Sequence, residues 1–207
     1  LINDNSATYV AWQWKANGGT TSSNTDGTIT STVQANTTAG FSIVTYTGNG
    51  SDNATVGHGL SVKPKVIIPK RRDSSGHWLI NDWSGDYANK LKLNDNEASS
   101  SSDSFVKDAS STTFTLGTDV DVNASSGTYV AYCFTEKKGY SKFSSFTGTG
   151  NADGPMVFCG FKPAWLMIKA TGSTGGASNW RIADNKRSTS GSNPVEKQLE
   201  ANTDKAE

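Results

Sequence analysis

The sequence has no excess of either charge, few cysteines and histidines, and no long apolar run. Its 207 residues include 19 basic and 19 acidic side chains, so the formal net charge is zero. Tight binding of nucleic acid needs clustered lysine and arginine, and we therefore expect no nucleic-acid partner. No apolar stretch approaches the length that spans a bilayer, so we expect no membrane insertion. The two histidines, His58 and His77, lack metal-ligand neighbours at suitable spacing. We predict no zinc site and no cofactor, and interpret both histidines as surface or turn residues.

The two cysteines, Cys133 and Cys159, both lie within apolar blocks. A disulfide between them is one interpretation. Two small buried thiols is the interpretation that we favour, since a reduced cysteine behaves as a small apolar residue. The cysteines therefore do not indicate whether the protein resides in a reducing or an oxidising compartment.

Glycine, serine, threonine and asparagine are abundant, and they separate short blocks of valine, isoleucine and aromatic residues. Blocks of this length suit short strands, and the polar stretches between them suit turns and loops. We predict an all-β protein of tandem β-sandwich or jelly-roll-like repeats with long polar loops.

Four sequence blocks occur twice in the same order, and they are the strongest signal in the chain. They are Thr8–Lys15 with Thr128–Thr135, Gly40–Gly50 with Gly139–Gly150, Lys63–Lys70 with Lys162–Lys169, and Trp78–Asp82 with Trp180–Asp184. Lys162 follows Lys63 by 99 residues, whereas Tyr129 follows Tyr9 by 120, because the polar stretch 18–39 occurs in the first copy only. We predict three segments: 1–39 is the last strand of a preceding repeat plus a polar linker, 40–137 is a complete repeat, and 138–207 is a truncated second copy.

Two of the repeated blocks, Thr8–Lys15 and Thr128–Thr135, have the alternation of strands. Aromatic residues on one face and small residues on the other suit a central strand that is covered on both sides. Each Lys-Pro pair marks the entrance of a further strand, since proline costs least where no ladder bond is needed. Residues 85–98 and 193–207 are each predicted to hold a short helix.

The run Asp119–Asn123 places oxygen ligands at alternate positions, as the start of a calcium loop does. Ala124 stands where such a loop needs glycine, and Val130 stands where it needs glutamate. We favour a solvated strand edge here, and Asp119, Asp121 and Asn123 stay only as weak metal candidates.

Aromatic rings beside asparagine and aspartate can bind the faces of sugars. The candidates for glycan contact are Trp83, Trp78, Trp180, Asp82 and Asp184. Core packing is the favoured role for Trp78 and Trp180, which recur in register, so Trp83 is the best candidate for an exposed ring. Asp82 and Asp184 recur once per copy at a strand end, which suits turn capping better than the paired carboxylates of a glycosidase. We predict no catalytic residue and no enzyme activity.

Several repeated blocks carry a resemblance to a known family. They are Gly127–Phe134, Gly139–Phe143, Thr147–Pro155, Gly160–Lys169 and Asn179–Arg187. They resemble an uncharacterised repeat domain of large bacteriophage virion proteins, common in marine phages, which often accompanies concanavalin-like lectin modules in tail-fibre or structural proteins. The resemblance implies a virion or extracellular location and a structural repeat of an appendage or fibre that contributes to assembly and host-surface adhesion. It implies a homo-oligomer or contacts with other virion proteins. The alternative is a carbohydrate-binding, lectin-like module that binds host-surface glycan.

Overall fold

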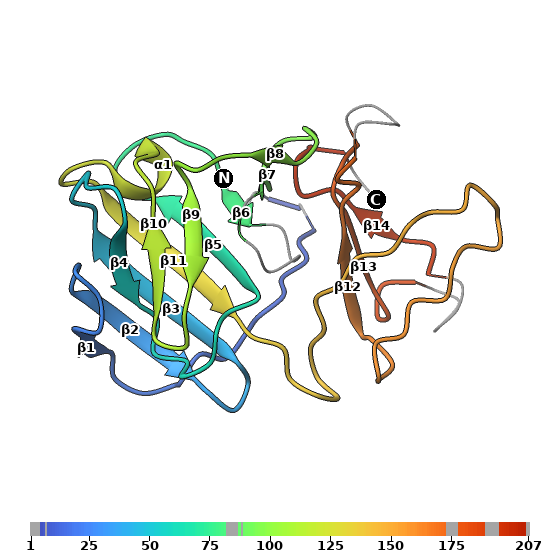
Figure 1. Ribbon diagram of the computed structural model, residues 1–207. Coiled ribbons are helices and arrows are strands. Elements are labelled where there is room, and N and C mark those ends of the chain that lie inside the picture. The colour runs from blue at the N-terminus through green and yellow to red at the C-terminus, as the bar shows by residue number, and fades with distance from the viewer. Residues whose placement is uncertain are drawn as a thin grey trace.

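The protein is described by a computed structural model that covers residues 5–6, 8–81, 87, 89–172, 178–188 and 195–205. Its elements (Figure 1) are β1 Ser22–Asn24, β2 Ser31–Asn36, β3 Phe41–Thr47, β4 Ala54–Gly57, β5 Val66–Arg71, β6 Leu79–Asn81, β7 Asn89–Lys92, β8 Ser100–Ser101, β9 Val106–Ala109, β10 Thr113–Leu116, α1 Val120–Asn123, β11 Thr128–Phe134, β12 Trp165–Ile168, β13 Arg181–Asp184 and β14 Gln198–Leu199. The protein is all-β apart from one short helix, which confirms the predicted fold class at this level. In the described part of the chain, no helix has the length and apolar character needed to cross a membrane.

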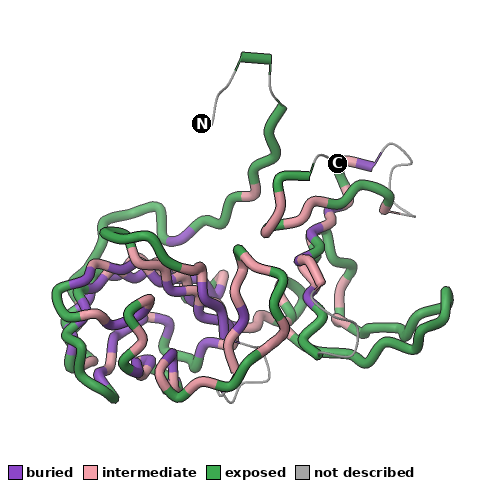
Figure 2. Tube along the Cα trace, turned by 90° about the horizontal axis from the view of Figure 1, so that it is seen from above, coloured by how far each residue is buried: buried purple, intermediate pink, exposed green. Residues whose placement is uncertain are grey.

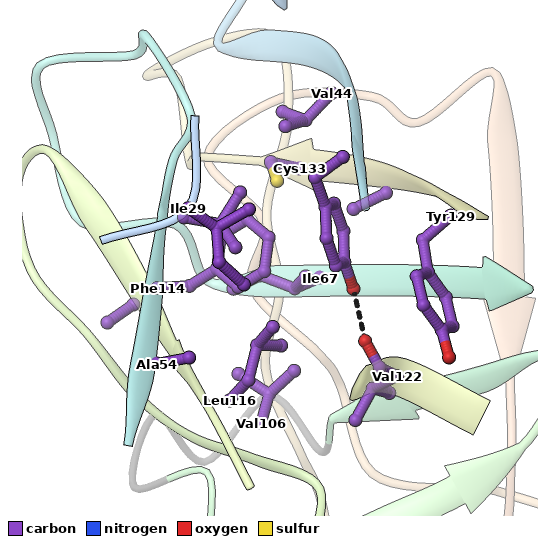
Figure 3. Packing of buried hydrophobic residues seen from close by; sticks show 14 of the residues in the cluster. Ile29, Val44, Ala54, Ile67, Val106, Phe114, Leu116, Val122, Tyr129 and Cys133 are labelled. Carbon is purple, nitrogen blue, oxygen red and sulfur yellow. Dashed lines mark hydrogen bonds between the residues drawn. The ribbon is translucent and has the colours of Figure 1, made fainter. Parts of the chain in front are cut away.

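Two antiparallel sheets pack face to face within residues 22–134, which we call the sandwich, and a third sheet in this range has the order β6-β7-β8. One sheet has the strand order β1-β2-β3-β11-β5, and the other has the order β4-β10-β9. Alternation along the strands points every second side chain between the sheets. Figure 3 shows Val44, Ile67 and Cys133 from the larger sheet converging with Phe114 and Leu116 from the smaller one. These side chains form the main hydrophobic core.

The β11 strand occupies the centre of the larger sheet, as its sequence predicts. It pairs with β3 along Thr128–Phe134 and with β5 along Tyr129–Phe134. Two further predicted strand entrances are confirmed, because β5 begins soon after Pro64 and β12 begins soon after Pro163. The apolar alternation and the proline positions of these blocks therefore correctly predict β11, β5 and β12.

Residues 138–205, which we call the C-terminal unit, contain a separate sheet with the order β12-β13-β14. Trp180 joins this unit to the sandwich, because its fully buried ring packs with Val66, Ile80 and Leu91. The Trp180 Nε1 donates a hydrogen bond of 2.8 Å to the carbonyl oxygen of Lys92. Most buried residues lie in the sandwich, although Lys169, Ile182, Asp184 and Ser188 of the C-terminal unit are also buried. Residues 144–158 are all exposed (Figure 2).

The sequence repeat has a counterpart in the hydrogen bonds before β6 and β13. The backbone amide of Trp78 donates to Asn94 Oδ1 at 2.9 Å, and the amide of Trp180 donates to Asn202 Oδ1 at 2.9 Å. The two tryptophans are equivalent in the sequence alignment of the copies. In each copy, an asparagine that follows later in the chain therefore accepts a hydrogen bond from the tryptophan directly before the short strand.

Residues 18–39 are part of the sandwich, not a polar linker. They contain β1 and β2, and β2 pairs with β3 from Ser31↔Tyr46 to Asn36↔Phe41. Val33 of β2 and Ile29, which precedes β2, belong to the core, and Ala35 of β2 packs against it. The domain boundaries at 39 and 137 stay a prediction.

Two other sequence predictions are wrong in the described residues. Thr8–Lys15 forms no strand, although its pattern matches that of β11. The regions predicted to hold short helices contain β7 and β14 instead, because each segment pairs with a preceding strand. In both cases the strands available for pairing determine the secondary structure, and the local sequence pattern does not.

Candidate functional site: an aromatic crevice

The outward face of the larger sheet carries a shallow crevice of about 290 Å³. Its walls are apolar and largely aromatic. They consist of Trp14, Phe41, Ile43, Ile68, Trp78, Leu93, Tyr132 and Phe134. The crevice exists because β11, β3 and β5 are apolar on both faces, so a row of rings remains outside the core.

The rings in the crevice contact one another closely. The Trp78 ring stacks on Tyr132 with centroids 6.2 Å apart and an interplanar angle of 18°. Phe41 lies parallel to Tyr132 at 6.5 Å and tilted against Phe134 at 4.7 Å. These contacts hold the rings as a platform onto which a flat apolar surface could pack.

Two polar side chains lie beside Trp78, which lines the crevice. Asn94 accepts a hydrogen bond from the Trp78 amide, and its Nδ2 lies 3.4 Å from His77 Nδ1. Among the described residues, no group of three or more histidine, cysteine, aspartate or glutamate side chains is placed to hold a metal ion. The arrangement therefore supports contact and stacking.

The structure separates the predicted glycan-contacting residues. Trp78 lines the crevice and is half-buried. Trp180 has no exposed surface, so it offers no ring face to a ligand and the core role favoured from sequence is confirmed. Asp82 and Trp83 lie outside the described residues.

Asp184 is a turn-capping carboxylate, as its position at a strand end predicts. It accepts hydrogen bonds from the backbone amides of Lys186 and Arg187, at 2.9 and 3.1 Å, and from Arg187 Nε at 2.6 Å. Trp12 Nε1 donates to Oδ2, the oxygen that Arg187 Nε also bonds, at 3.3 Å. Burial raises the pKa of this carboxyl, but the hydrogen bonds from Arg187 and the two amides outweigh burial and hold the pKa at about 2. Its oxygens are committed to protein donors.

The weak calcium candidates do not form a strand edge, because residues 120–123 form helix α1. Asp119 caps this helix by accepting from the Asp121 amide at 2.9 Å, and it pairs with Lys90 at 3.2 Å. Asn123 is buried, and its side chain bonds to backbone groups of two loops. A helical turn points these three side chains in different directions, so the alternate spacing that suggested ligands is lost.

Comparison with known proteins places the chain in one family. Residues 1–207 match the family described as a domain of unknown function, DUF7483. The chain belongs to this family. No curated protein and no solved structure matches it.

The buried His58 of this DUF7483 chain has structural partners. His58 is buried and not a surface residue: its Nδ1 accepts from the Leu60 amide at 3.2 Å, and its Nε2 lies 3.4 Å from the carbonyl oxygen of Ser110. Burial lowers its pKa. Cys133 and Cys159 are both free, but only Cys133 is buried, so the interpretation as two buried thiols holds for one of them.

Sequence reasoning missed most of the crevice of the DUF7483 chain. Phe41, Ile43 and Phe134 were not predicted to form a site. A signal was present in β11, whose Val130, Tyr132 and Phe134 lie opposite an equally apolar face. The sequence predicts a strand that is covered on both sides, but it does not identify which residues cover the aromatic face.

Proposed function

We propose that this DUF7483 chain is a structural repeat of a bacteriophage virion appendage or fibre, whose β units pack on one another and contribute to assembly and host-surface adhesion. The phage setting and the virion location rest on the sequence resemblance. Tandem sandwich-type repeats that associate as a homo-oligomer or with other virion proteins are part of the same proposal.

The observation that carries the proposal is the packing of Trp180 on the sandwich. A residue from one copy of the repeat is fully buried against Val66, Ile80 and Leu91 of the other copy. The amide of Ser99 donates to the carbonyl oxygen of Thr171 across the same contact at 3.1 Å. Repeats that bury aromatic residues between neighbours form arrays whose stability depends on these junctions.

The adjoining crevice supports the same function. Its rings are apolar and partly exposed, with Trp14 exposed by 41%. An aromatic face of this kind suits contact with another protein surface, since aromatic residues are enriched in interfaces. The geometry assigns no catalytic role to any residue, and we propose that the chain is not an enzyme.

The proposal is tested by sedimentation velocity of the full chain over a wide range of concentration, together with immunogold labelling of particles that carry the gene. We expect self-association and labelling of an appendage. Trp14→Ala, which removes an exposed ring of the crevice, is expected to weaken self-association while the sandwich stays folded by circular dichroism. The control Met156→Ala changes a residue that is 89% exposed and should associate like the unsubstituted chain. A monomer at every concentration, together with unlabelled particles, would contradict the proposal.

A second candidate function is binding of a host-surface glycan at the crevice. The specific observation in its favour is the half-buried Trp78 ring, which lies beside the amide of Asn94 and the imidazole of His77. Sugar faces stack on such rings while neighbouring polar groups bond to hydroxyls.

A glycan array separates this candidate from the first. If Trp78 is the platform, Trp78→Ala removes binding, whereas Met156→Ala keeps it because the exposed Met156 does not line the crevice. Absence of glycan binding by the unsubstituted chain, or binding that survives Trp78→Ala, would count against it.

A further inference from the structure

The β12 strand and its counterpart β5 both lie at an edge of a sheet, but they pair with different neighbours. The sheet order is β12-β13-β14, so among the described strands β12 pairs with β13 alone. Its counterpart β5 pairs with β11. The two strands also differ in exposure: Leu166 of β12 is 44% exposed, whereas the equivalent Ile67 of β5 is fully buried.

Residues 8–15 have the sequence of the strand that β12 lacks. The block repeats the Thr-Tyr-Val-Ala pattern and the alternate aromatic positions of β11. In β11 these positions lie in the centre of a sheet, whereas Val10 and Trp14 are 43% and 41% exposed. Residues 8–15, which have the sequence of a central strand, and the β12 edge are thus both incompletely buried in the same chain.

These two parts already contact each other through their side chains. The Trp14 and Trp165 rings lie 5.4 Å apart and nearly perpendicular, and the Trp12 and Trp165 rings lie 6.3 Å apart. Trp12 Nε1 also donates to Asp184 Oδ2 at 3.3 Å, and the Arg187 guanidinium lies 5.6 Å from the centre of the Trp12 ring.

The sandwich supplies the expected register. In the β11–β5 pair, Phe134 is opposite Val66. The repeat makes Trp14 the counterpart of Phe134, and Trp165 the counterpart of Val66. The contact between Trp14 and Trp165 is therefore the one that this register requires.

We propose that the free edge of β12 is a strand-accepting site and that its occupant is residues 8–15 of the same chain, paired antiparallel in the register of β11 with β5. Pairing satisfies backbone groups along the edge and covers an exposed strand that would otherwise recruit foreign strands. It ties the first residues of the chain to the C-terminal unit. The inference stands independently of the virion function proposed above.

Cysteine pairs in the full chain test the register. In a Cys159→Ser background, Trp14→Cys with Trp165→Cys should form a disulfide within one chain under mild oxidation. The matched control is Gln13→Cys with Trp165→Cys, because a strand points residue 13 to the opposite face. We expect at least a tenfold faster closure for the first pair, read by mass spectrometry and non-reducing gels.

Two outcomes would overturn the proposal. Equal closure of both pairs would mean that residues 8–15 hold no strand register, and disulfide-linked dimers in place of closed monomers would mean that the occupant comes from a second copy. Hydrogen exchange of the unsubstituted chain provides a check that needs no variant. Backbone amides within residues 8–15 should exchange at least tenfold more slowly than those in residues 144–158, and exchange at the same rate would also overturn the proposal.

Discussion

The sandwich and the C-terminal unit contain the same sequence blocks but bury them to different extents. Ile67 in the sandwich is fully buried, and its counterpart Leu166 is 44% exposed. Leu60 is a core residue, whereas Cys159 at the equivalent position is half-buried. The residues that follow the shared Gly-Tyr-Ser or Gly-Phe-Ser block form β3 in the sandwich, and residues 142–149 of the C-terminal unit form no strand.

This difference shows what the blocks need in order to fold as strands. In the sandwich, β3 has β2 and β11 on its two sides, and the smaller sheet covers its inner face. The described part of the C-terminal unit has no counterparts of β9, β10 or α1. Side-chain packing against neighbours, more than intrinsic propensity, determines where a strand forms. Equivalent sequences therefore diverge because their partners differ.

The matched pair Ile67→Ala and Leu166→Ala tests the comparison most directly and should give its largest effect. Removing a fully buried isoleucine side chain leaves a cavity, and the free energy of unfolding should fall by about 2–5 kcal/mol. Because Leu166 is half-exposed, Leu166→Ala should lower the free energy of unfolding by about 1 kcal/mol or less. Urea denaturation of both variants measures the difference. Equal losses would mean that the two units are packed alike.

The fold could be predicted from sequence where a block meets its partners within the chain. The β11 strand, the entrances of β5 and β12, and the core position of Trp180 all follow from apolar alternation, proline placement and recurrence. The same reasoning wrongly predicted a strand at Thr8–Lys15. The block has the alternation of a strand, but whether it forms one depends on pairing with an edge that is distant in the sequence. The strands β1 and β2 were missed because their outward residues are polar and short.

Asn123→Ala should be the next largest effect, and it probes a connection that the sandwich has and the C-terminal unit lacks. The buried Asn123 side chain donates to the carbonyl oxygens of Ser51 and Gly117, at 2.8 and 3.0 Å, and accepts from the Asn49 amide at 3.0 Å. Its loss leaves buried backbone groups unpaired, and unfolding free energy should fall by about 2–3 kcal/mol.

The control for Asn123 is Asn151→Ala in the C-terminal unit. Asn151 lies in an exposed turn, and its replacement should change stability by less than about 0.5 kcal/mol. Chemical denaturation of the two variants side by side gives the answer. A loss below about 1 kcal/mol for Asn123→Ala would show that the loops hold without this side chain.

The candidate site was only partly predictable, for a reason that Trp78 and Asp184 illustrate. Recurrence identified both as fixed positions, and turn capping by Asp184 is confirmed. The crevice around Trp78 arises from rings on three strands that are far apart in sequence, Phe41, Ile68 and Tyr132 among them. Such convergence requires the strand order, and the strand order depends on long-range pairing that the repeats alone do not define.

Alkaline pH should weaken the sandwich specifically. Burial raises the pKa of the Cys133 thiol from 9.0 to about 12, and burial also raises the pKa of the Tyr46 hydroxyl. The folded state therefore keeps these groups protonated, and their contribution is complete below the unfolded pKa and lost as pH rises toward the folded pKa. At pH 10.5 the Cys133 thiol alone should cost about 2 kcal/mol of unfolding free energy.

Urea denaturation at pH 7, 9 and 10.5 measures this loss. In Cys133→Ala the decline between pH 9 and 10.5 should be shallower by about 2 kcal/mol, whatever the stability of the variant at pH 7. Cys159→Ser should decline like the unsubstituted chain. An unchanged slope in Cys133→Ala would contradict the assignment.

Acid should act on the C-terminal unit instead, with the smallest effect of the four. The Asp184 carboxyl has a pKa of about 2 against 3.8 for the ordinary group, since Arg187 and two backbone amides stabilise the charged form despite burial. Its contribution is therefore complete above pH 4 and is lost as pH falls toward 2, by about 1–2 kcal/mol. Hydrogen exchange should show β12 and β13 opening over this pH range before β3 and β11. Asp184→Asn should remove the pH dependence of that opening, because its side chain does not titrate. If the sandwich strands open first, the carboxylate does not hold the C-terminal unit together, and the two units do not differ in their response to acid.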